Sequence, residues 1–286
     1  MSAGPTIFDR PLLRARRRRA ERLGPVTFLI ERVAADLAER LSAVLRQFEH
    51  GADIGTPGDT LRQALAATGK VASVAAIDLG DDEAVPLAES SLDLAVSALA
   101  LQFTNDLPGV LVQIRRALKP DGLFLAALLG GDTLTELRQA FAAAESEVDG
   151  GLSPRVAPFA DIRDLGALLQ RAGFALPVVD SERLTVRYGS AFALMQDLRR
   201  MGATNVLTER RRVPLRRATL LRMAEIYGAR FADADGRLRA TFEIVFLSGW
   251  APHQSQQQPL KPGSAKTRLA DALGVQEIAA GEKTGR

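Results

Sequence analysis

The chain has 286 residues, of which 47% are hydrophobic and 25% charged, and its formal net charge is +3. These values are ordinary for a globular protein with a sizeable core, and the charge is too small to indicate a nucleic-acid partner. Cysteine is absent, which excludes disulfides, thiolate metal ligands and a cysteine nucleophile, and only two histidines are present, which argues against a histidine metal cage or a Ser-His-Asp triad.

The N-terminal segment, residues 1–24, contains the arginine-rich run RPLLRARRRRAER from Arg10 to Arg22. We interpret it as the solvated face of a helix. Binding to acidic lipid or nucleic acid, or part of a transit peptide, are the alternatives. No apolar run is long enough to span a membrane and no signal-peptide core is present. We therefore expect a bacterial cytoplasmic protein, with peripheral contact at the inner membrane as the only membrane contact.

The next elements alternate between helix and strand. Apolar spacing predicts an amphipathic helix over 25–45, and a short strand, GADIG, follows it. A helix over 59–68, with Asp59 as its N-cap, and a strand over 71–78 come next. The run over 91–101 is almost continuously apolar, which predicts a strand buried on both faces, as in a parallel sheet.

Capping and turn signals order the following segment. Asp106 caps a helix that the KPDG turn over 119–122 ends, and 123–129 is another buried strand. Thr133 and Glu136 have the spacing of a capping box for the next helix. Strands and helices in this alternation predict an α/β fold with a mostly parallel sheet.

The pattern changes after Gly150. Helices are predicted over 161–174, where Gly173 ends the helix, and over 190–202, and a strand is predicted over 238–250. From residue 254 the chain is rich in Gln, Pro and Ser, and we expect a mobile tail over 254–286.

Several of these segments together resemble a known family. The DIG turn after the first strand, the buried strand over 91–101 and the LKPDG turn are similar to class I S-adenosylmethionine-dependent methyltransferases. Six further segments resemble one subfamily, the methyltransferase-like assembly factors of respiratory complex I. They are IFDR (7–10), NDLPGVLVQIRRALKPDGLFLAALLGGDTLTELR (105–138), GGLSPRVAPF (150–159), DLGALLQRAGF (164–174), MQDLRRMGATN (195–205) and GWAPHQSQQQP (249–259).

The resemblance implies a Rossmann-like domain over 25–253, with helices on both faces of its sheet, a cofactor half at 25–150 and a family-specific half at 151–253. It implies S-adenosylmethionine as the cofactor and a protein substrate or partner, such as an iron–sulfur subunit of complex I, because a family member is regarded as an arginine hydroxylase. A non-catalytic assembly scaffold is the first alternative, and a carrier-protein methyltransferase of biotin synthesis is a weaker one.

Two departures from the family pattern concern the cofactor half. The family's D-x-G-x-G-x-G loop is Asp53-Ile54-Gly55-Thr56-Pro57-Gly58-Asp59 here. Proline removes a backbone donor and fixes φ, so we expect a compromised loop. A helix and a strand are also missing between Asp78 and the acidic turn over 81–87. This predicts a sheet shortened at one edge, without one wall of the adenine pocket.

The resemblance assigns two sets of site residues, with no catalytic residue and no metal ligand among them. The alternative for each is structural: an inherited turn, a solvated acid, a packed serine or tryptophan, an exposed arginine or a tail histidine. The cofactor set is Asp53, Gly55, Gly58, Asp78, Asp82 and Ser97, and the substrate or partner set is Arg138, Arg155, Trp250 and His253.

Overall fold

The computed structural model describes residues 6–257, 271 and 273–275. The chain divides into two units, Met1–Pro252 and His253–Arg286. Most of the predicted tail over 254–286 lies outside the described residues. In the described part, no helix is long and apolar enough to cross a membrane.

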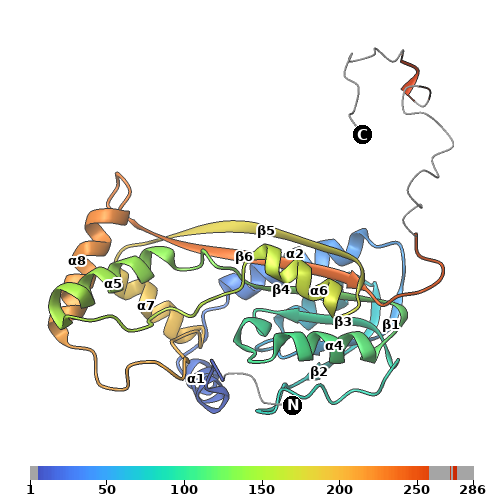
Figure 1. Ribbon diagram of the computed structural model, residues 1–286, viewed down its shortest axis with the longest axis horizontal. Coiled ribbons are helices and arrows are strands. Elements are labelled where there is room, and N and C mark those ends of the chain that lie inside the picture. Colours follow the sequence, from blue (N-terminus) through green and yellow to red (C-terminus); the bar gives the residue numbers. More distant parts are fainter. Residues whose placement is uncertain (1–5, 258–270, 272, 276–286) are drawn as a thin grey trace, which may run out of the picture. The chain divides into compact units, whose positions relative to one another are not determined.

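The first unit is built on a six-stranded sheet with the order β2-β1-β3-β4-β6-β5 (Figure 1). The β2/β1, β1/β3 and β3/β4 pairs are parallel, whereas β6 is antiparallel to both β4 and β5. The prediction of a mostly parallel α/β sheet is therefore confirmed. The strands are β1 (Phe48–Ile54), β2 (Val71–Ile77), β3 (Leu92–Ala98), β4 (Leu118–Leu129), β5 (Ala175–Tyr188) and β6 (Leu238–Trp250).

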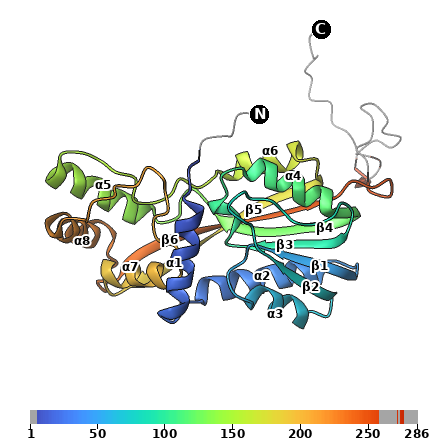
Figure 2. The same ribbon diagram turned by 90° about the horizontal axis from the view of Figure 1, so that it is seen from below.

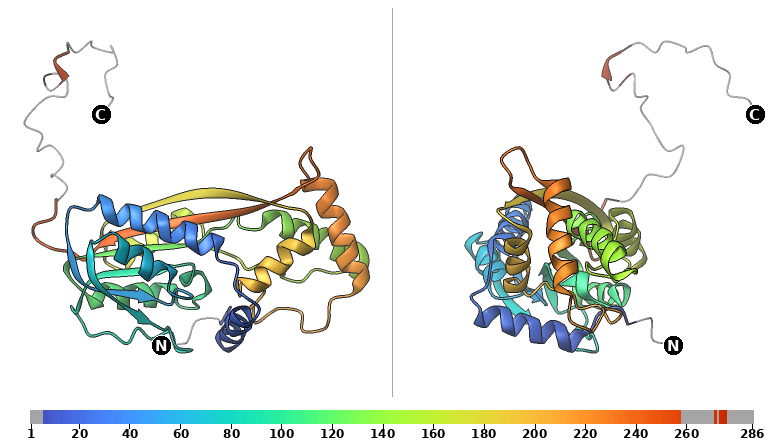
Figure 3. Two further views of the ribbon diagram at one scale, coloured as in Figure 1. Left: turned by 180° about the vertical axis from the view of Figure 1, so that it is seen from behind. Right: turned by 90° about the vertical axis from the view of Figure 1, so that its left-hand side faces the viewer.

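Helices cover both faces of the sheet, as predicted. Figure 2 shows α4 and α6 on one face and α2 and α3 on the other. The long strands β5 and β6 run past the shorter ones towards α7 and α8 (Figure 3). The helices are α1 (Arg10–Arg22), α2 (Phe28–Ala43), α3 (Thr60–Ala67), α4 (Leu107–Ala117), α5 (Thr135–Asp149), α6 (Ile162–Arg171), α7 (Ala191–Arg200) and α8 (Arg217–Phe231).

The central strand β3 is buried along its whole length. Its side chains alternate between two hydrophobic clusters, because successive residues of a strand point to opposite faces. Leu94 and Val96 join the cluster that includes α2 and α3, and Ala95 joins the cluster that includes α4 and α6. Burial on both faces explains why this run of sequence is continuously apolar.

The sheet ends at β2, whose side chains are mostly exposed. Within the described residues, the chain passes from β2 to β3 through residues 78–91 without another helix or strand. The predicted shortening of the sheet at this edge is confirmed. Because β1 lies between β2 and β3, the carboxyl end of β1 is the switch point where open α/β sheets place their ligands.

The predicted capping box of Thr133 and Glu136 is wrong. The helix α5 begins at Thr135, after Leu134 at φ +55°. Both side chains bond to β6 instead, since Thr133 Oγ1 donates to the Glu243 carbonyl at 3.2 Å and Thr241 Oγ1 donates to Glu136 at 2.6 Å. The β4–α5 connection is thus fastened to a strand that the sequence places more than a hundred residues away.

Three further elements differ from the prediction. The helix α4 does end before the KPDG turn, but β4 already begins at Leu118 and passes through the turn, with Asp121 at φ +62°. The strand β5 and the helix α8 have no counterpart in the predicted elements. Every second side chain of β5 is exposed along most of its length, so it lacks the apolar run that marks the central strands.

Candidate functional site

The candidate cofactor loop, Gly55–Asp59, connects β1 to α3. Asp53 lies just before it and is almost completely buried. Its Oδ2 accepts a hydrogen bond from Arg62 Nη1 at 3.0 Å. Burial raises the pKa of the Asp53 carboxyl, while hydrogen bonds from Thr56 and the neighbouring Arg62 oppose this rise. Asp53 therefore organises the loop through Thr56 and Arg62.

Gly55 is half-buried, and its backbone groups are bonded to other parts of the protein. Its N–H donates to the Ile77 carbonyl at 2.8 Å, and its carbonyl accepts from Arg17 Nη1 at 3.2 Å. A Cβ on Gly55 would lie 3.4 Å from Ala100 and 3.5 Å from Leu79. Its φ of +73° also requires glycine at this turn. In a nucleotide-type loop the backbone N–H groups point at the ligand, but here the N–H of Gly55 serves the sheet.

The arginines over the loop come from α1. Arg10 Nη2 donates to the carbonyls of Leu79 and Gly80 at 2.7 and 3.3 Å. Burial and the charge of Arg10 lower the pKa of Arg17 to about 10, and the charge of Asp78 opposes this. The interpretation of the arginine run as a solvated face is therefore wrong for Arg10 and Arg17. Arg17 lies four residues after Leu13 and three before Ala20, both buried, and this helical spacing is the signal that identifies it.

Two neighbouring side chains contact the loop at Gly55. Leu79 lies beside Gly55, is 2% exposed and belongs to the core cluster of α4 and α6. Arg17 holds the Gly55 carbonyl.

Asp78 and Ser97 lie next to the start of the loop, because Ile54 pairs with Ile77 and accepts a hydrogen bond from Ser97. Asp78 and Asp82 are exposed, and Asp82 Oδ1 accepts from the Ala84 N–H at 3.2 Å within its own turn. Ser97 is fully buried and its Oγ donates to the Ile54 carbonyl at 2.7 Å, so it joins β3 to β1. Gly58, at φ +74°, has no atom within 4 Å of where its Cβ would lie.

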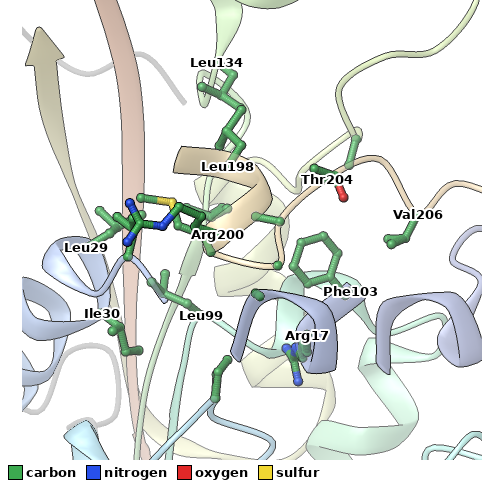
Figure 4. A pocket seen from close by; sticks show the side chains of 18 of the residues that line it. Arg17, Leu29, Ile30, Leu99, Phe103, Leu134, Leu198, Arg200, Thr204 and Val206 are labelled. Atoms are coloured by element: carbon green, nitrogen blue, oxygen red, sulfur yellow. The ribbon is translucent and has the colours of Figure 1, made fainter. Parts of the chain in front are cut away.

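A large cavity opens beside Gly58. Its volume is about 460 Å³, which is in the range of small-molecule sites. Its walls come from α1, α2, the cofactor loop, the chain after β3, α5, α7 and the loop after α7. Figure 4 shows that most of the side chains drawn there are apolar, and the charged residues of the whole lining are Arg17, Glu21, Asp59, Arg155 and Arg200. Leu29, Leu99, Phe103, Leu134, Leu198 and Val206 are among the lining residues.

Of the residues predicted to form the site, Gly58 and Arg155 line this cavity. Arg155 Nε donates to Glu145 Oε1 at 2.7 Å, and its guanidinium lies 5.5 Å from the centre of the Phe141 ring. Glu145 is 1% exposed and also accepts from the N–H and Oγ of Ser153 at 2.8 and 2.7 Å. This buried ion pair fixes the 150–159 segment as part of the cavity wall.

The remaining predicted residues lie outside the cavity wall. Arg138 Nη2 donates to the carbonyls of Gly131 and Thr133 and so closes the β4–α5 turn. Trp250 ends β6 and packs against the hydrophobic core. His253 is exposed, belongs to the second unit, and its Nδ1 lies 2.7 Å from Ser255 Oγ. In the described residues no group of three or more His, Asp or Glu side chains is placed to hold a metal ion.

The fold and the position of the loop define the class of protein. Residues 33–126 match a family model of a methyltransferase domain. A proposed methyltransferase of Bacillus halodurans has a similar structure, with a TM-score of 0.51, 16% identity, and coverage of 77% of this chain and 99% of that one. The YcgJ protein of Bacillus subtilis has a TM-score of 0.50 at 13% identity, covering 76% and 98%. The first unit has the class I methyltransferase fold.

Full-length relatives identify the family. The mitochondrial arginine-hydroxylase NDUFAF5 of Mus musculus is 37% identical over 298 residues, which cover 97% of this chain and 87% of the relative. The human protein of the same name is 38% identical over 286 residues, covering 93% and 83%. The chain belongs to this family of methyltransferase-like complex I assembly factors.

Two expectations are affected by these comparisons. The expected location in a bacterial cytoplasm is wrong, because these nearly full-length relatives are mitochondrial proteins. The malonyl-[acyl-carrier protein] O-methyltransferase of Laribacter hongkongensis is 42% identical, but the match covers only 66% of this chain and 61% of that protein. The weaker alternative of a carrier-protein methyltransferase thus rests on a partial match.

Proposed function

We propose that this protein serves the assembly of respiratory complex I in mitochondria by binding one of its subunits, and that the iron–sulfur subunit near the quinone site is that partner. The observation that carries the proposal is the similarity to the NDUFAF5 proteins over nearly the whole chain. The arrangement of the loop supports a binding role, since Leu79 and Arg17 cover Gly55 while the adjoining cavity is hollow.

Modification of an arginine on the partner is the second candidate function. It is favoured by the name of the relatives and by two carboxylates, Glu21 and Asp59, among the residues that line the cavity. Carboxylates are the acceptors that match a guanidinium in geometry and charge. These two side chains would orient the partner's arginine beside Gly58.

The test is rescue of human cells that lack their NDUFAF5 protein. The chain is expressed with a mitochondrial leader, and the amount of assembled complex I is measured on native gels. We expect rescue by the wild type and by Asp53→Asn, because binding does not need the cofactor loop. Imported, folded wild-type protein that leaves complex I unassembled would refute the proposal.

Mass spectrometry of the rescued complex separates the two functions. A gain of one oxygen atom on an arginine would support modification if it is lost in a Glu21→Gln, Asp59→Asn variant while assembly persists. Such a gain requires molecular oxygen as the oxidant and two electrons from an external reductant, with the second oxygen atom leaving as water. Rescue by Asp53→Asn without any arginine modification would support binding alone. Loss of rescue in Asp53→Asn, with the variant still folded, would indicate a cofactor-dependent role.

A further inference from the structure

A groove between α1 and α7 gathers positive charge. Arg16 and Arg19 from α1 line it together with Arg199 and Arg200 from α7, and no acidic residue is among its lining residues. Elsewhere arginines pair with carboxylates, as Arg40 does with Asp180 at 2.7 Å. Within the described residues, none of the four arginines of the groove lies within 4.0 Å of a carboxylate.

The protein's own contacts only partly satisfy these guanidiniums. Arg16 donates to the Asn205 carbonyl, and Arg200 Nε donates to the Gly24 carbonyl at 2.7 Å. Arg19 Nη2 reaches Thr204 Oγ1 at 3.5 Å, and its buried Nε has no hydrogen-bond partner in the described chain. Burial, followed by the charges of Arg19 and Arg210, lowers the pKa of Arg16, while Asp9 opposes this. Like charges held together this way are stabilised by an anion that accepts from several guanidiniums at once.

The groove adjoins the apolar cavity. Met195, Arg200 and Thr204 line both, so the two share a boundary at α7 and the loop after it. The helix α1 lies between them, with Arg17, Ala20 and Glu21 on the cavity and Arg16, Arg19 and Leu23 on the groove. Figure 4 shows Arg200 and Thr204 at the cavity wall. An apolar volume beside a cluster of unpaired cations matches a molecule with an apolar chain and an anionic head.

We infer that the α1–α7 groove and the adjoining cavity together form a binding site for an anionic amphiphile, with the chain in the cavity and a phosphate or carboxylate head on Arg16, Arg19, Arg199 and Arg200. Phosphate and carboxylate share the acceptor geometry that arginine recognises. The site shares its cavity with the place proposed above for the partner's arginine, but binding of isolated ligands to it is measured separately from complex I assembly.

Isothermal titration of the full chain tests the inference with three probes that share one alkyl chain: dodecyl phosphate, laurate and dodecanol, below their aggregation concentrations. We expect the two anions to bind at least about tenfold more tightly than dodecanol, since charge-assisted hydrogen bonds add to burial of the chain. Inorganic phosphate, which lacks the chain, should bind at least about tenfold more weakly than dodecyl phosphate. Equal affinity for dodecyl phosphate and dodecanol, or no binding of either, would overturn the inference.

Variants separate the two parts of the site. Arg19→Gln with Arg199→Gln should remove the preference for the anions and keep dodecanol binding, whereas Ala203→Phe, placed in the cavity wall, should weaken all three alkyl probes. Arg18→Gln is the matched control, because Arg18 is exposed on the same helix and lines neither pocket. Arg199→Gln alone, at an exposed position, keeps the test valid if the double variant unfolds.

A membrane surface is a different source of the same head group. Sedimentation with vesicles of phosphatidylglycerol addresses it. Binding to vesicles that depends on Arg19 and Arg199, without any saturable binding of dodecyl phosphate, would mean that the arginines face a bilayer and that the cavity takes no chain. That result would also overturn the inference.

Discussion

The contacts around Gly55 differ from those in the adjoining cavity. At Gly55 the contacts come from the protein itself: the N–H donates to the Ile77 carbonyl, the carbonyl accepts from Arg17, and Leu79 lies alongside. Next to it, α5, α7 and the 150–159 segment enclose about 460 Å³. We call Gly55 with its contacts the closed loop, and we call α5, α7 and the 150–159 segment the open roof.

The difference shows what a deletion at the edge of a sheet does to a ligand site. Residues 78–91 join β2 to β3 without another helix or strand, and Leu79 and Val85 of this segment are buried in the core cluster of α4 and α6. β1, β3 and β4 stay paired in one parallel sheet, and the cavity is present beside them. Fold and ligand site are therefore separable in this chain, because an edge strand can be lost without disturbing β1, β3 and β4.

The largest change in unfolding free energy is expected from a substitution in the open roof. Replacing Glu145 by alanine leaves the guanidinium of Arg155 without its carboxylate in a mostly buried place. Loss of one partner of a buried pair typically costs about 3–5 kcal/mol of unfolding free energy. Urea denaturation measures this. Glu147→Ala is the control on the same helix, since its side chain is 47% exposed, and it should change the midpoint much less. Equal effects in both variants would mean that the pair does not hold the roof.

The closed loop is tested at Leu79. Leu79→Ala removes a buried side chain above Gly55 and should lower the unfolding free energy by roughly 2–4 kcal/mol, the transfer and cavity cost of such a truncation. Leu45→Ala, at a position that is 97% exposed, is the matched control and should leave the denaturation midpoint almost unchanged. A near-zero effect at Leu79 would show that the segment after β2 does not pack on the loop.

The fold was largely predictable from the sequence where local patterns determine it. β3 and β4 are buried on both faces and so carry continuous apolar runs, and Asp106 and Gly173 mark helix ends by local chemistry. The strand β5 was not predicted, because its exposed positions alternate with half-buried ones and it has no continuous apolar run. The capping box of Thr133 and Glu136 was wrongly predicted, because their true partners on β6 lie far along the chain.

The site was less predictable because it depends on long-range packing. Pro57 and the missing segment indicated a compromised loop, but only the structure shows Leu79 and Arg17 against Gly55. Glu145 was missed since a carboxylate in a helix usually lies in solvent, and its burial follows from Ser153 and Arg155 folding back onto it.

A smaller effect is expected from the charge on Asp53. Its folded-state pKa is raised above its ordinary value of 3.8, so its contribution to stability is complete below that pH and is lost as pH rises through the raised pKa. Asp53→Asn cannot ionise. The unfolding free energy of this variant minus that of the wild type should therefore grow between pH 3.8 and neutrality, by about 1.4 kcal/mol for each unit of the rise. Urea denaturation across this pH range measures it, and a difference that is flat or shrinks with pH would contradict the raised pKa.

The smallest expected effect is the heat of titrating the protein with S-adenosylhomocysteine, which we expect to be absent up to millimolar concentration, whereas micromolar binding would correspond to about −8 kcal/mol. We base this expectation on the contacts at Gly55, whose carbonyl accepts from Arg17 and beside which Leu79 is buried in the core. An Arg17→Ala variant asks which of the two contacts closes the loop. If it binds and the wild type does not, Arg17 alone closes a loop that is otherwise competent. If neither the wild type nor the variant binds, Leu79 and the missing helix and strand keep the loop closed without Arg17. Saturable binding to the wild type would contradict the prediction, because it would mean that the loop accepts the ligand in solution.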